Sequence, residues 1–437
     1  MRRLLLSLVA IALCSRATAI AGEEPAIEWR PWSDSVFTEA KNDHRFVLLD
    51  LGTVWCHWCH VMDEVTYQDP DVIKLARERY IAVRVDADAR PDLSNRYEDY
   101  GWPATIVFNA EGGELVKRRG YLPPRQMASM LQAIIDDPTP GPSVVQDAPF
   151  AAGTESTLAD DTRNELRRIL IEGYDPKNGG WGTIQKFLDA DTVEYATNES
   201  RRGDERFERM ARETLSAELQ LMDPAWGGVY QYSTDGDWQH AHFEKIMQRQ
   251  ADDLRIYANA YALWHDKTWL SAAQRIRGFL KEFLTSPNGA FYTSQDADLI
   301  PGQHGGEYFQ LSDSARRKKG VPRIDTHVYS RENGGQLMGW RRSARSQTTK
   351  KLLPRQFKPQ TGLARIAPFQ TVVFGMMRRM SPGRIWGIRF RWAALFSHCT
   401  PSQPIGHGWR ERSRQPNLLP RISKARRVMS VVLVWAP

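Results

Sequence analysis

The stretch Trp55-Cys56-His57-Trp58-Cys59-His60-Val61-Met62 is the most informative part of this 437-residue chain. It places two cysteines three positions apart, directly after the apolar run 46–52, which has the composition of a buried strand. A strand that delivers such a pair to the start of a helix is typical of a thiol–disulfide exchange site. The helix N-terminus stabilises a thiolate on the first cysteine, and the second lies close enough to resolve a mixed disulfide. The pattern therefore predicts redox chemistry at Cys56 and Cys59.

The same residues allow three other interpretations. Cys-x-x-Cys-His is also the attachment signature of a c-type haem, with His60 as an axial ligand. Such a haem needs a ligand on its other face, and Met62 is too near in sequence to reach it. A zinc site from Cys56, Cys59, His57 and His60 would have to close a tetrahedron around the start of a helix, which is unfavourable. The pair could also be a fixed local disulfide. We expect neither a metal nor a cofactor.

The N-terminus has the layout of a secretory signal peptide. Arg2 and Arg3 form a positive region, residues 4–13 form a short apolar core, and small residues at 17–21 offer cleavage sites. We therefore expect residues 1–21 to be removed and the mature protein to be periplasmic or secreted, with no transmembrane segment after cleavage. Export implies an oxidising compartment, where a Cys-x-x-Cys pair favours redox chemistry.

The chain has four cysteines, and their distribution excludes a scaffold held together by several disulfides. Cys14 lies in the expected signal peptide, Cys56 and Cys59 form the close pair, and Cys399 stands alone. The composition, with 41% hydrophobic and 25% charged residues, is ordinary for a soluble globular protein.

Residues 22–136 alternate strand-like and helix-like patterns, which predicts a small α/β domain. Residues 137–153 are rich in Pro, Gly, Ala and Ser and are expected to form a linker. In the α/β domain the expected strands are 46–51, 81–86, 102–108 and 114–116, and the expected helices are 59–65, 72–79 and 124–135.

From 154 to 334 the pattern becomes helical. Apolar residues recur at helical spacing along 254–264 and 270–284. Loops of similar composition, with proline, glycine and an aromatic residue, interrupt the helical stretches. A repeated turn of this kind predicts stacked helical hairpins and thus an all-α domain. The loops are 175–181, 223–230 and 286–292.

The surroundings of the cysteine pair resemble proteins with the thioredoxin fold. Asp50 lies six residues before Cys56, where thioredoxins carry a buried carboxylate, and Trp55 precedes the first cysteine as it does in thioredoxins. Pro103 begins an apolar strand, like the cis-proline segment that faces the active site in this fold. The resemblance implies that Cys56 attacks the substrate and Cys59 resolves the mixed disulfide. It also implies that Asp50 helps to deprotonate Cys59 and that Pro103 shapes the substrate groove.

Four further side chains are expected to tune such a site: Trp55, His57, Trp58 and His60. A cationic His57 would favour the Cys56 thiolate and make the disulfide a better oxidant. The expected substrates are the thiols and disulfides of other proteins, and a separate redox partner protein would return the pair to its starting state.

The full string around the cysteines is much more specific than Cys-x-x-Cys. It resembles the family that fuses a thioredoxin-like domain to a six-hairpin-glycosidase-like helical domain, named after a spermatogenesis-associated thioredoxin-like protein. The resemblance covers residues 26–334 and implies an α/β thioredoxin-like domain followed by a partial (α/α) toroid of helical hairpins. In the helical half it rests on the segments 223–228, 232–235, 242–245 and 294–298.

The helical half also suggests an alternative function, in which it binds a carbohydrate or a peptide and the thioredoxin-like domain is accessory. The candidate cleft residues are His242, Glu244, Asp296 and Asp298, with Asp235 as a further carboxylate. Glycoside hydrolysis needs two carboxylates that face each other across a cleft. Acidic residues beside glycine turns, however, commonly cap helices or pair with basic residues. The aromatic candidates for stacking on sugar rings are Trp181, Trp226, Tyr230 and Trp238.

Residues 335–437 lack any helical or strand period and contain 20 Lys and Arg residues but a single acidic one, Glu411. Basic clusters bind phosphate without sequence preference. An exported protein rarely meets nucleic acid, so we expect no specific nucleic-acid partner. The segment is either a disordered basic extension or the product of a reading-frame shift near 333–335. We favour the shift because patterning and acidic residues are lost abruptly; one uninterrupted frame in independently sequenced genes would contradict it.

Overall fold

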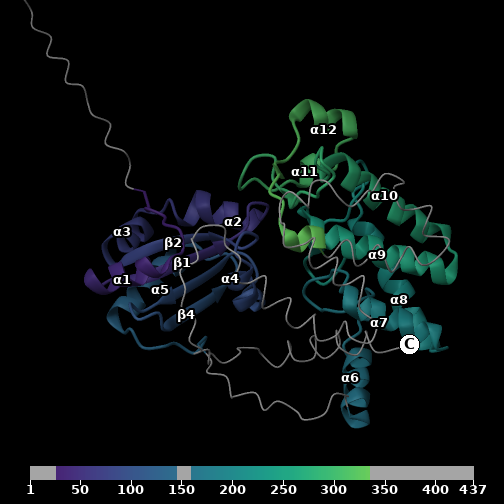
Figure 1. Cartoon of the computed structure of the whole chain (residues 1–437), viewed down its shortest axis with the longest axis horizontal. Coiled ribbons are helices and arrows are strands. Elements are labelled where there is room, and N and C mark those ends of the chain that lie inside the picture. Colours follow the sequence, from purple (N-terminus) through teal and green to yellow (C-terminus); the bar gives the residue numbers. More distant parts are fainter. Residues whose placement is uncertain (1–25, 145–158, 335–437) are drawn as a thin grey trace, which may run out of the picture.

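The computed structural model describes residues 26–144 and 159–334. The expected signal peptide at 1–21, part of the expected linker at 137–153 and the basic segment at 335–437, with Cys399, lie outside these described residues. The described part comprises an α/β domain and a helical domain that lie side by side (Figure 1). Within it, no helix is long and apolar enough to span a membrane.

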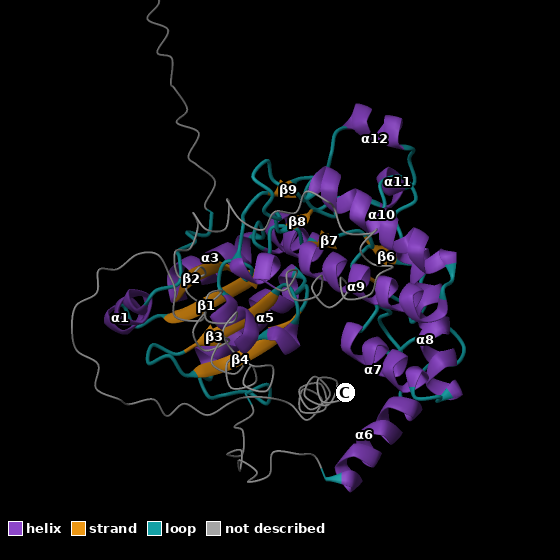
Figure 2. Cartoon of the chain, turned by 45° about the vertical axis from the view of Figure 1, so that its right-hand side comes forward, coloured by secondary structure: helices purple, strands orange, loops and turns teal. Residues whose placement is uncertain are grey.

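A four-stranded mixed sheet forms the centre of the N-terminal domain (Figure 2). Its strands are β1 (Phe46–Gly52), β2 (Tyr80–Asp86), β3 (Ala104–Phe108) and β4 (Glu114–Arg119), arranged in the order β2-β1-β3-β4. Strand β1 is parallel to β2 and antiparallel to β3, and β3 is antiparallel to β4. The four expected strands are therefore confirmed. Strand β3 starts after Pro103, since proline has no N–H to donate to the ladder.

The helices of this domain are α1 (Asp34–Asn42), α2 (His57–Val61), α3 (Pro70–Arg79), α4 (Pro91–Arg96) and α5 (Pro124–Asp136). A π-helix, η1 (Met62–Thr66), continues α2, and a short 3-10 turn, η2 (Glu98–Tyr100), follows α4. The three expected helices are present as α2 with η1, α3 and α5. Helices α1 and α4 were not expected, because each buries too few side chains to give a clear helical period; α1 buries Val36 and Ala40.

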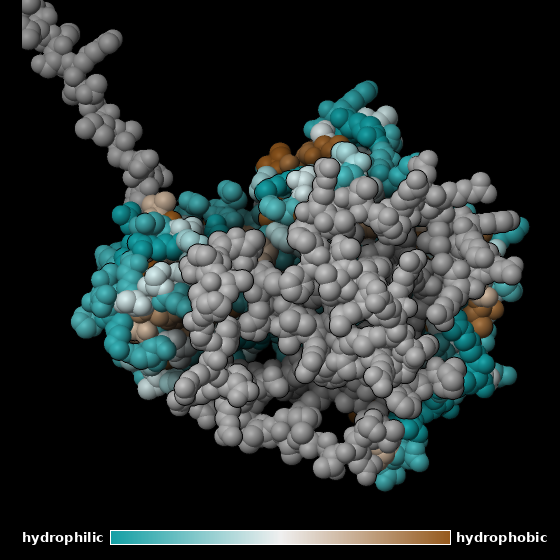
Figure 3. All heavy atoms as spheres, viewed as in Figure 1, coloured by the Kyte–Doolittle hydropathy of each residue, from teal (hydrophilic) through white to brown (hydrophobic). Residues whose placement is uncertain are grey.

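The sheet is covered on both faces, with β1 at its centre. Leu48 packs into a core shared with α3 and α5, whereas Leu49 and Leu51 pack into a core shared with α1 and α4. Because side chains alternate along a strand, Asp50 lies on the same face as Leu48. The part of this domain that is visible in Figure 3 is mostly hydrophilic, in keeping with apolar side chains gathered inside.

The described part of the helical domain contains two helical hairpins, a further long helix and several shorter elements. The pairs α7–α8 and α9–α10 pack against each other, and the helical stretches expected at 254–264 and 270–284 are found in α9 and α10. The helical region expected after the α/β domain is thus confirmed, and the partial (α/α) toroid that the resemblance implies stays a prediction. The helices are α6 (Asp160–Glu172), α7 (Ala190–Arg201), α8 (Glu205–Glu218), η3 (Leu219–Leu221), α9 (Met247–Trp264), α10 (Lys267–Phe283), α11 (Gly306–Phe309) and α12 (Asp313–Lys319).

The helical domain also contains short strands. Strands β5 (Tyr232–Ser233) and β6 (Ala241–His242) form one pair. Strands β7 (Lys245–Ile246), β8 (Ser294–Gln295) and β9 (Ile324–Asp325) form a second small sheet. The segments that come after β6 and β8 carry the candidate cleft residues Glu244, Asp296 and Asp298.

Two of the repeated loops are built alike and fix these segments. In each loop an aspartate, Asp175 or Asp223, exchanges backbone hydrogen bonds with glycines four and five positions later. A buried lysine then binds the aspartate carboxylate: Lys186 at 2.7 Å in the first loop and Lys245 at 2.5 Å in the second. Because Lys245 begins β7, this ion pair also fixes the backbone of the preceding residue, Glu244.

Candidate redox site

Cys56 and Cys59 are joined by a disulfide at the start of α2, with their Cα atoms 5.2 Å apart. Cys56 is the N-cap residue of α2, and its Sγ accepts the backbone N–H of Cys59 at 3.1 Å. A sulfur thus stands where a hydroxyl or carboxylate usually caps a helix. After reduction, the same N–H donor would stabilise a thiolate on Cys56.

The two sulfurs differ in their surroundings. Cys56 is 4% exposed, whereas Cys59 is partly exposed. A Cβ added to Gly52, at the end of β1, would lie 3.2 Å from the Sγ of Cys59. The glycine therefore leaves room for the second sulfur against the sheet.

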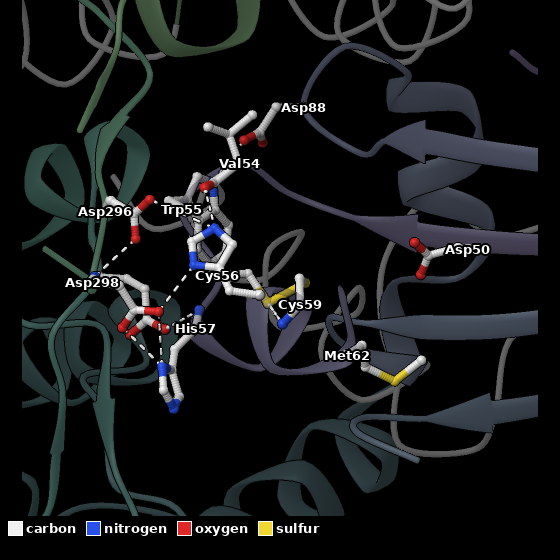
Figure 4. The surroundings of a disulfide bond; sticks show 12 residues. Asp50, Val54, Trp55, Cys56, His57, Cys59, Met62, Asp88, Asp296 and Asp298 are labelled. Carbon is white, nitrogen blue, oxygen red and sulfur yellow. Dashed lines mark hydrogen bonds and ion pairs between the residues drawn. A yellow bond between two sulfur atoms is a disulfide. The ribbon is translucent and has the colours of Figure 1, made fainter. Parts of the chain in front are cut away.

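Asp50 occupies the buried position on β1 that the resemblance predicted for it, 7% exposed. Its carboxylate accepts the Nε–H of Arg84 at 2.9 Å, and Arg84 also pairs with Asp63. Burial raises the pKa of Asp50 to about 6, against the opposing effect of Arg84. Figure 4 shows Asp50 on the strand, away from the disulfide. Its role in deprotonating Cys59 stays a prediction, although a carboxyl that titrates near neutrality suits proton transfer.

Pro103 stands at the start of β3, the neighbour of β1 in the sheet. The Trp102–Pro103 peptide bond is cis, as the resemblance implied. Pro103 is buried, and its carbonyl accepts the backbone N–H of Gly120 at 2.8 Å. Its part in shaping a substrate groove stays a prediction.

Trp55, which precedes Cys56, contacts residues of both domains. Its indole Nε1–H donates to Asp88 at 2.7 Å, and Arg331 of the helical domain donates to the other oxygen of Asp88 at 2.6 Å. The carbonyl of Trp55 also accepts the N–H of Ala297, at 3.5 Å. Asp88 and Arg331 could not be identified from the sequence, because neither belongs to a motif and they are far apart in the chain.

The helical domain binds the redox helix through Asp298 (Figure 4). The Asp298 carboxylate lies 2.8 Å from the Nδ1 of His57 and 3.0 Å from the Nδ1 of His60. Asp298 is 3% exposed, and the His57 side chain is almost fully buried. Two side chains predicted to tune the cysteines are therefore held by a residue predicted to line a separate cleft. The predicted redox site and the predicted cleft of the helical domain therefore form a single site.

His60 has hydrogen-bond acceptors at both of its ring nitrogens. Its Nε2 lies 3.0 Å from the carbonyl of Val54, and its Nδ1 faces Asp298. Both nitrogens must carry a proton to donate to both acceptors, which requires the imidazolium form. Burial lowers the pKa of His60, but Asp298 and Asp296 outweigh it and raise the pKa to about 8. For Asp298 burial raises the pKa, but the bonds from His57 and His60 lower it overall.

This ion pair predicts a pH-dependent stability. A His60 pKa raised from 6.5 to about 8 stabilises the fold fully below pH 6.5, and the contribution is lost as the pH rises through 8. Because the pKa of Asp298 is lowered, this group contributes stability at pH values above the ordinary aspartate pKa, and the contribution is lost only in acid. We expect the difference in unfolding free energy between wild type and His60→Gln to shrink by about 1–2 kcal/mol from pH 6.5 to 9. Urea denaturation at several pH values measures it; a constant difference would contradict a charged His60.

The other candidate cleft residues lie around the same helix. The Oε1 of Glu244 accepts the backbone N–H of His57 at 3.3 Å. Asp296 accepts the N–H of Asp298 at 2.9 Å and lies 3.7 Å from the Nε2 of His60. Burial raises the pKa of Glu244 to about 7 and that of Asp296 to about 6. Three buried carboxyl groups of one domain thus surround the histidines of the other.

Two aromatic side chains border the site. His242 stacks on Tyr232, with ring centroids 4.3 Å apart, and its ring lies 6.5 Å from that of His57. Burial and the neighbouring His57 lower the pKa of His242 to about 4, so it is neutral at pH 7. Trp58 is 37% exposed and stacks on Tyr121. Of the residues predicted to tune the site, Trp58 offers the largest surface to a partner.

His60, Asp296 and Asp298 also bring three potential metal ligands within 4.8 Å of one another, which no other group among the described residues does. Their atoms already have partners, however. Asp298 accepts hydrogen bonds from His57, from His60 and from the N–H of Gly302 at 3.0 Å. Hydrogen bonds from the protein itself therefore already occupy the oxygens of Asp298.

The aromatic residues proposed to stack on sugars are mostly core residues. Trp226, Tyr230 and Trp238 are 7%, 4% and 2% exposed. The indole N–H of Trp226 bonds to Asp313, and that of Trp238 bonds to the carbonyl of Asn178. The prediction that these three side chains stack on a sugar is therefore wrong, because they fill the domain interior. Asp235 is exposed and lies apart from the buried carboxyl cluster, 3.7 Å from His240.

Comparison with known proteins agrees with this architecture. Residues 19–136 match the family model Thioredox_DsbH, described as "Protein of unknown function, DUF255". Spermatogenesis-associated protein 20 of Mus musculus is 26% identical over 310 residues, which are 63% of this chain and 39% of that protein. The chain thus spans about two fifths of the length of this relative.

Shorter matches concern the N-terminal domain. Thioredoxin 1 of Chlorobaculum tepidum is 36% identical over 93 residues, which are 84% of that protein and 20% of this chain. Thiol:disulfide interchange protein DsbD 2 of Pseudomonas aeruginosa is 35% identical over 89 residues, 15% of its length and 20% of this chain. We conclude that the N-terminal domain belongs to the thioredoxin family, and that the chain as a whole is similar to spermatogenesis-associated protein 20.

Proposed function

We propose that this protein is an exported thiol–disulfide oxidoreductase that acts on the thiols and disulfides of other proteins. The observation that carries the proposal is the Cys56–Cys59 disulfide at the start of α2, with Cys56 as the N-cap residue. The similarity to thioredoxin 1 and to a thiol:disulfide interchange protein supports it. The burial of Asp50 and the cis Trp102–Pro103 bond support it as well.

The chemistry is that of the two sulfurs. In the reduced protein the Cys56 thiolate attacks a substrate disulfide, forms a mixed disulfide and releases one substrate thiolate. Cys59, after losing its proton, attacks the sulfur of Cys56 and releases the second substrate thiolate. Two electrons pass from the protein dithiol to the substrate, and the Cys56–Cys59 disulfide is formed. A redox partner protein would then reduce it; the reverse sequence oxidises a substrate dithiol.

Export is part of the proposal and rests on the N-terminal sequence. Arg2, Arg3 and the apolar run 4–13 are followed by small residues suitable for cleavage. Mass spectrometry of the protein purified from its source would show whether residues 1–21 are removed. An intact N-terminus would argue for a cytosolic reductant instead.

A redox titration of the whole protein tests the function. The protein, with Cys399→Ser as a background change so that only the pair is counted, is equilibrated in glutathione buffers and its free thiols are trapped. We expect one two-electron transition that disappears in Cys56→Ser. A midpoint near roughly −270 mV would indicate a reductant and one near roughly −120 mV an oxidant.

The same samples test the alternatives. A Soret band in their visible absorption would assign Cys56, Cys59 and His60 to a haem. A pair that stays oxidised throughout would indicate a structural disulfide and an accessory domain. Either result would overturn the proposed function.

A further inference from the structure

Glu244 is a buried carboxyl group that the thiol–disulfide exchange chemistry does not use. It is 3% exposed, and its Oε1 accepts the backbone N–H of His57, the residue next to Cys56. Its second oxygen, Oε2, has no hydrogen-bond partner within the described residues. The neighbouring Lys245 turns away to Asp223 and the carbonyl of Gly227. A carboxyl group from the helical domain is thus fixed one residue away from the redox-active sulfur.

The charges around Glu244 leave it without a dedicated counter-ion. Of the groups that face it, His57 is bound by Asp298, which is itself acidic, and Tyr232 and His242 are neutral at pH 7. Burial raises the pKa of Glu244 to about 7. Its charge therefore forms in the pH range in which a cysteine thiol loses its proton.

We propose that Glu244 is a positioning residue through which the helical domain controls the reactivity and the redox equilibrium of Cys56. The inference rests on the proposed function and names its regulator. When Glu244 is ionised, a buried negative charge at the backbone N–H of His57, the residue that follows Cys56, opposes the formation of a second negative charge on the Cys56 sulfur. The carboxylate therefore disfavours the reduced, thiolate-bearing state and favours the disulfide.

Glu244 takes no part in the bond changes of the exchange reaction whose equilibrium it shifts. A substrate dithiol reduces the Cys56–Cys59 disulfide: the S–S bond breaks, one S–S bond forms in the substrate, and two electrons enter the protein. Of the two substrate protons, one goes to Cys59 and one to water, leaving a thiolate on Cys56. Only the thiolate product feels the repulsion from Glu244, so removal of the carboxylate charge shifts this equilibrium toward the dithiol form.

Glu244→Gln in the full chain, with Cys399→Ser as background, tests the proposal. The amide keeps the size of the side chain and an acceptor for the His57 N–H but removes the charge. We expect the pKa of Cys56 to fall by about one unit and its alkylation by iodoacetamide at pH 7 to become about tenfold faster, as followed by mass spectrometry. The equilibrium with glutathione is expected to shift about tenfold toward the dithiol form, which corresponds to about 30 mV.

Two variants serve as controls. Glu218→Gln removes another fully buried carboxyl of the same domain, on α8, which faces Arg249 at 3.6 Å rather than the redox helix. It is expected to leave both the alkylation profile and the glutathione equilibrium at wild-type values. Glu244→Asp keeps the charge and is expected to restore most of the wild-type pH profile, which a purely structural role of Glu244 would not explain.

The outcomes separate this inference from the proposed function. If Glu244→Gln has the wild-type profile while Cys56→Ser still abolishes the redox transition, the inference fails and the function stands. If the pair never titrates in the wild type, the function itself fails. If Glu244→Gln no longer melts cooperatively, the variant cannot be used, and the pH dependence of Cys56 alkylation in the wild type provides the test. If the ionisations of Glu244 and Cys56 are coupled, the alkylation rate rises with pH in two steps. A rate that follows the titration of one group alone would overturn the proposal.

Discussion

Cys56→Ser is expected to abolish thiol–disulfide exchange, and Cys59→Ser is expected to accumulate a mixed disulfide with the substrate. A serine hydroxyl at position 56 is not a nucleophile toward disulfides at neutral pH, so the catalysed rate should fall by on the order of a hundredfold or more. Without Cys59 the first step still runs, but no internal thiol completes it. Insulin reduction measures the rate, and non-reducing gels show the trapped species.

The structure makes the order of attack a question for experiment. Cys56 is the N-cap residue and receives the N–H of Cys59, which favours its thiolate, yet it is 4% exposed while Cys59 is more accessible. If Cys56→Ser accumulated the mixed disulfide and Cys59→Ser did not, the roles would be reversed. Cys399→Ser is the matched control and is expected to retain wild-type exchange.

Asp298→Ala is expected to lower the free energy of unfolding by about 3–5 kcal/mol, the usual cost of breaking a buried ion pair by removing one partner. The change leaves His57, His60 and the N–H of Gly302 without their shared acceptor. It also removes the main polar contact between α2 and the helical domain, so the Cys56–Cys59 pair should be reduced faster by a bulky phosphine. Urea denaturation gives the stability, and thiol trapping over time gives the rate.

A histidine–aspartate pair elsewhere in the domain provides the control. Asp237 accepts a bond from His240 at 3.0 Å, but that histidine is exposed. Asp237→Asn is therefore expected to change stability little and to leave the reduction rate unchanged. An Asp298→Ala variant that unfolds like the wild type would mean that the two domains do not hold each other through this cluster.

The N-terminal half of the site could be predicted because its signals are local. The run 46–52 is apolar at successive positions, so it had to be a strand covered on both faces. The spacing of Cys56 and Cys59 then placed both sulfurs at the start of the next helix. Asp50 lies on that strand and Pro103 directly precedes its neighbour β3; both positions were expected from the resemblance to thioredoxins. The π-helical turn at 62–66 was not predicted, since no residue pattern marks it.

The helical half was predicted at the level of its elements. Apolar spacing indicated α9 and α10, and the repeated aspartate–glycine loops indicated hairpins. The function of each loop side chain could not be deduced, because the same residues suit a helix cap, an ion pair or a cleft. Trp226 and Trp238 were candidates for a sugar-binding surface but fill the core, since composition does not show whether the side chain of a loop residue points inward.

The sequence by itself determined the thioredoxin-like domain, its redox pair and the helical character of the second domain, because hydrophobic period and cysteine spacing act over a few residues. Only the tertiary structure decided that Glu244 and Asp298 belong to the redox site. They meet His57 across 187 and 241 positions of sequence, and no local pattern encodes such a contact.

The electrostatics of the site also depend on this contact between the domains. Burial there raises the pKa of Glu244 to about 7, and the carboxylates of Asp298 and Asp296 outweigh burial and raise the pKa of His60 to about 8. A pKa depends on the charges and the solvent that folding brings to a side chain, which no stretch of sequence contains. The electrostatic environment of Cys56 is therefore a property of the two domains together.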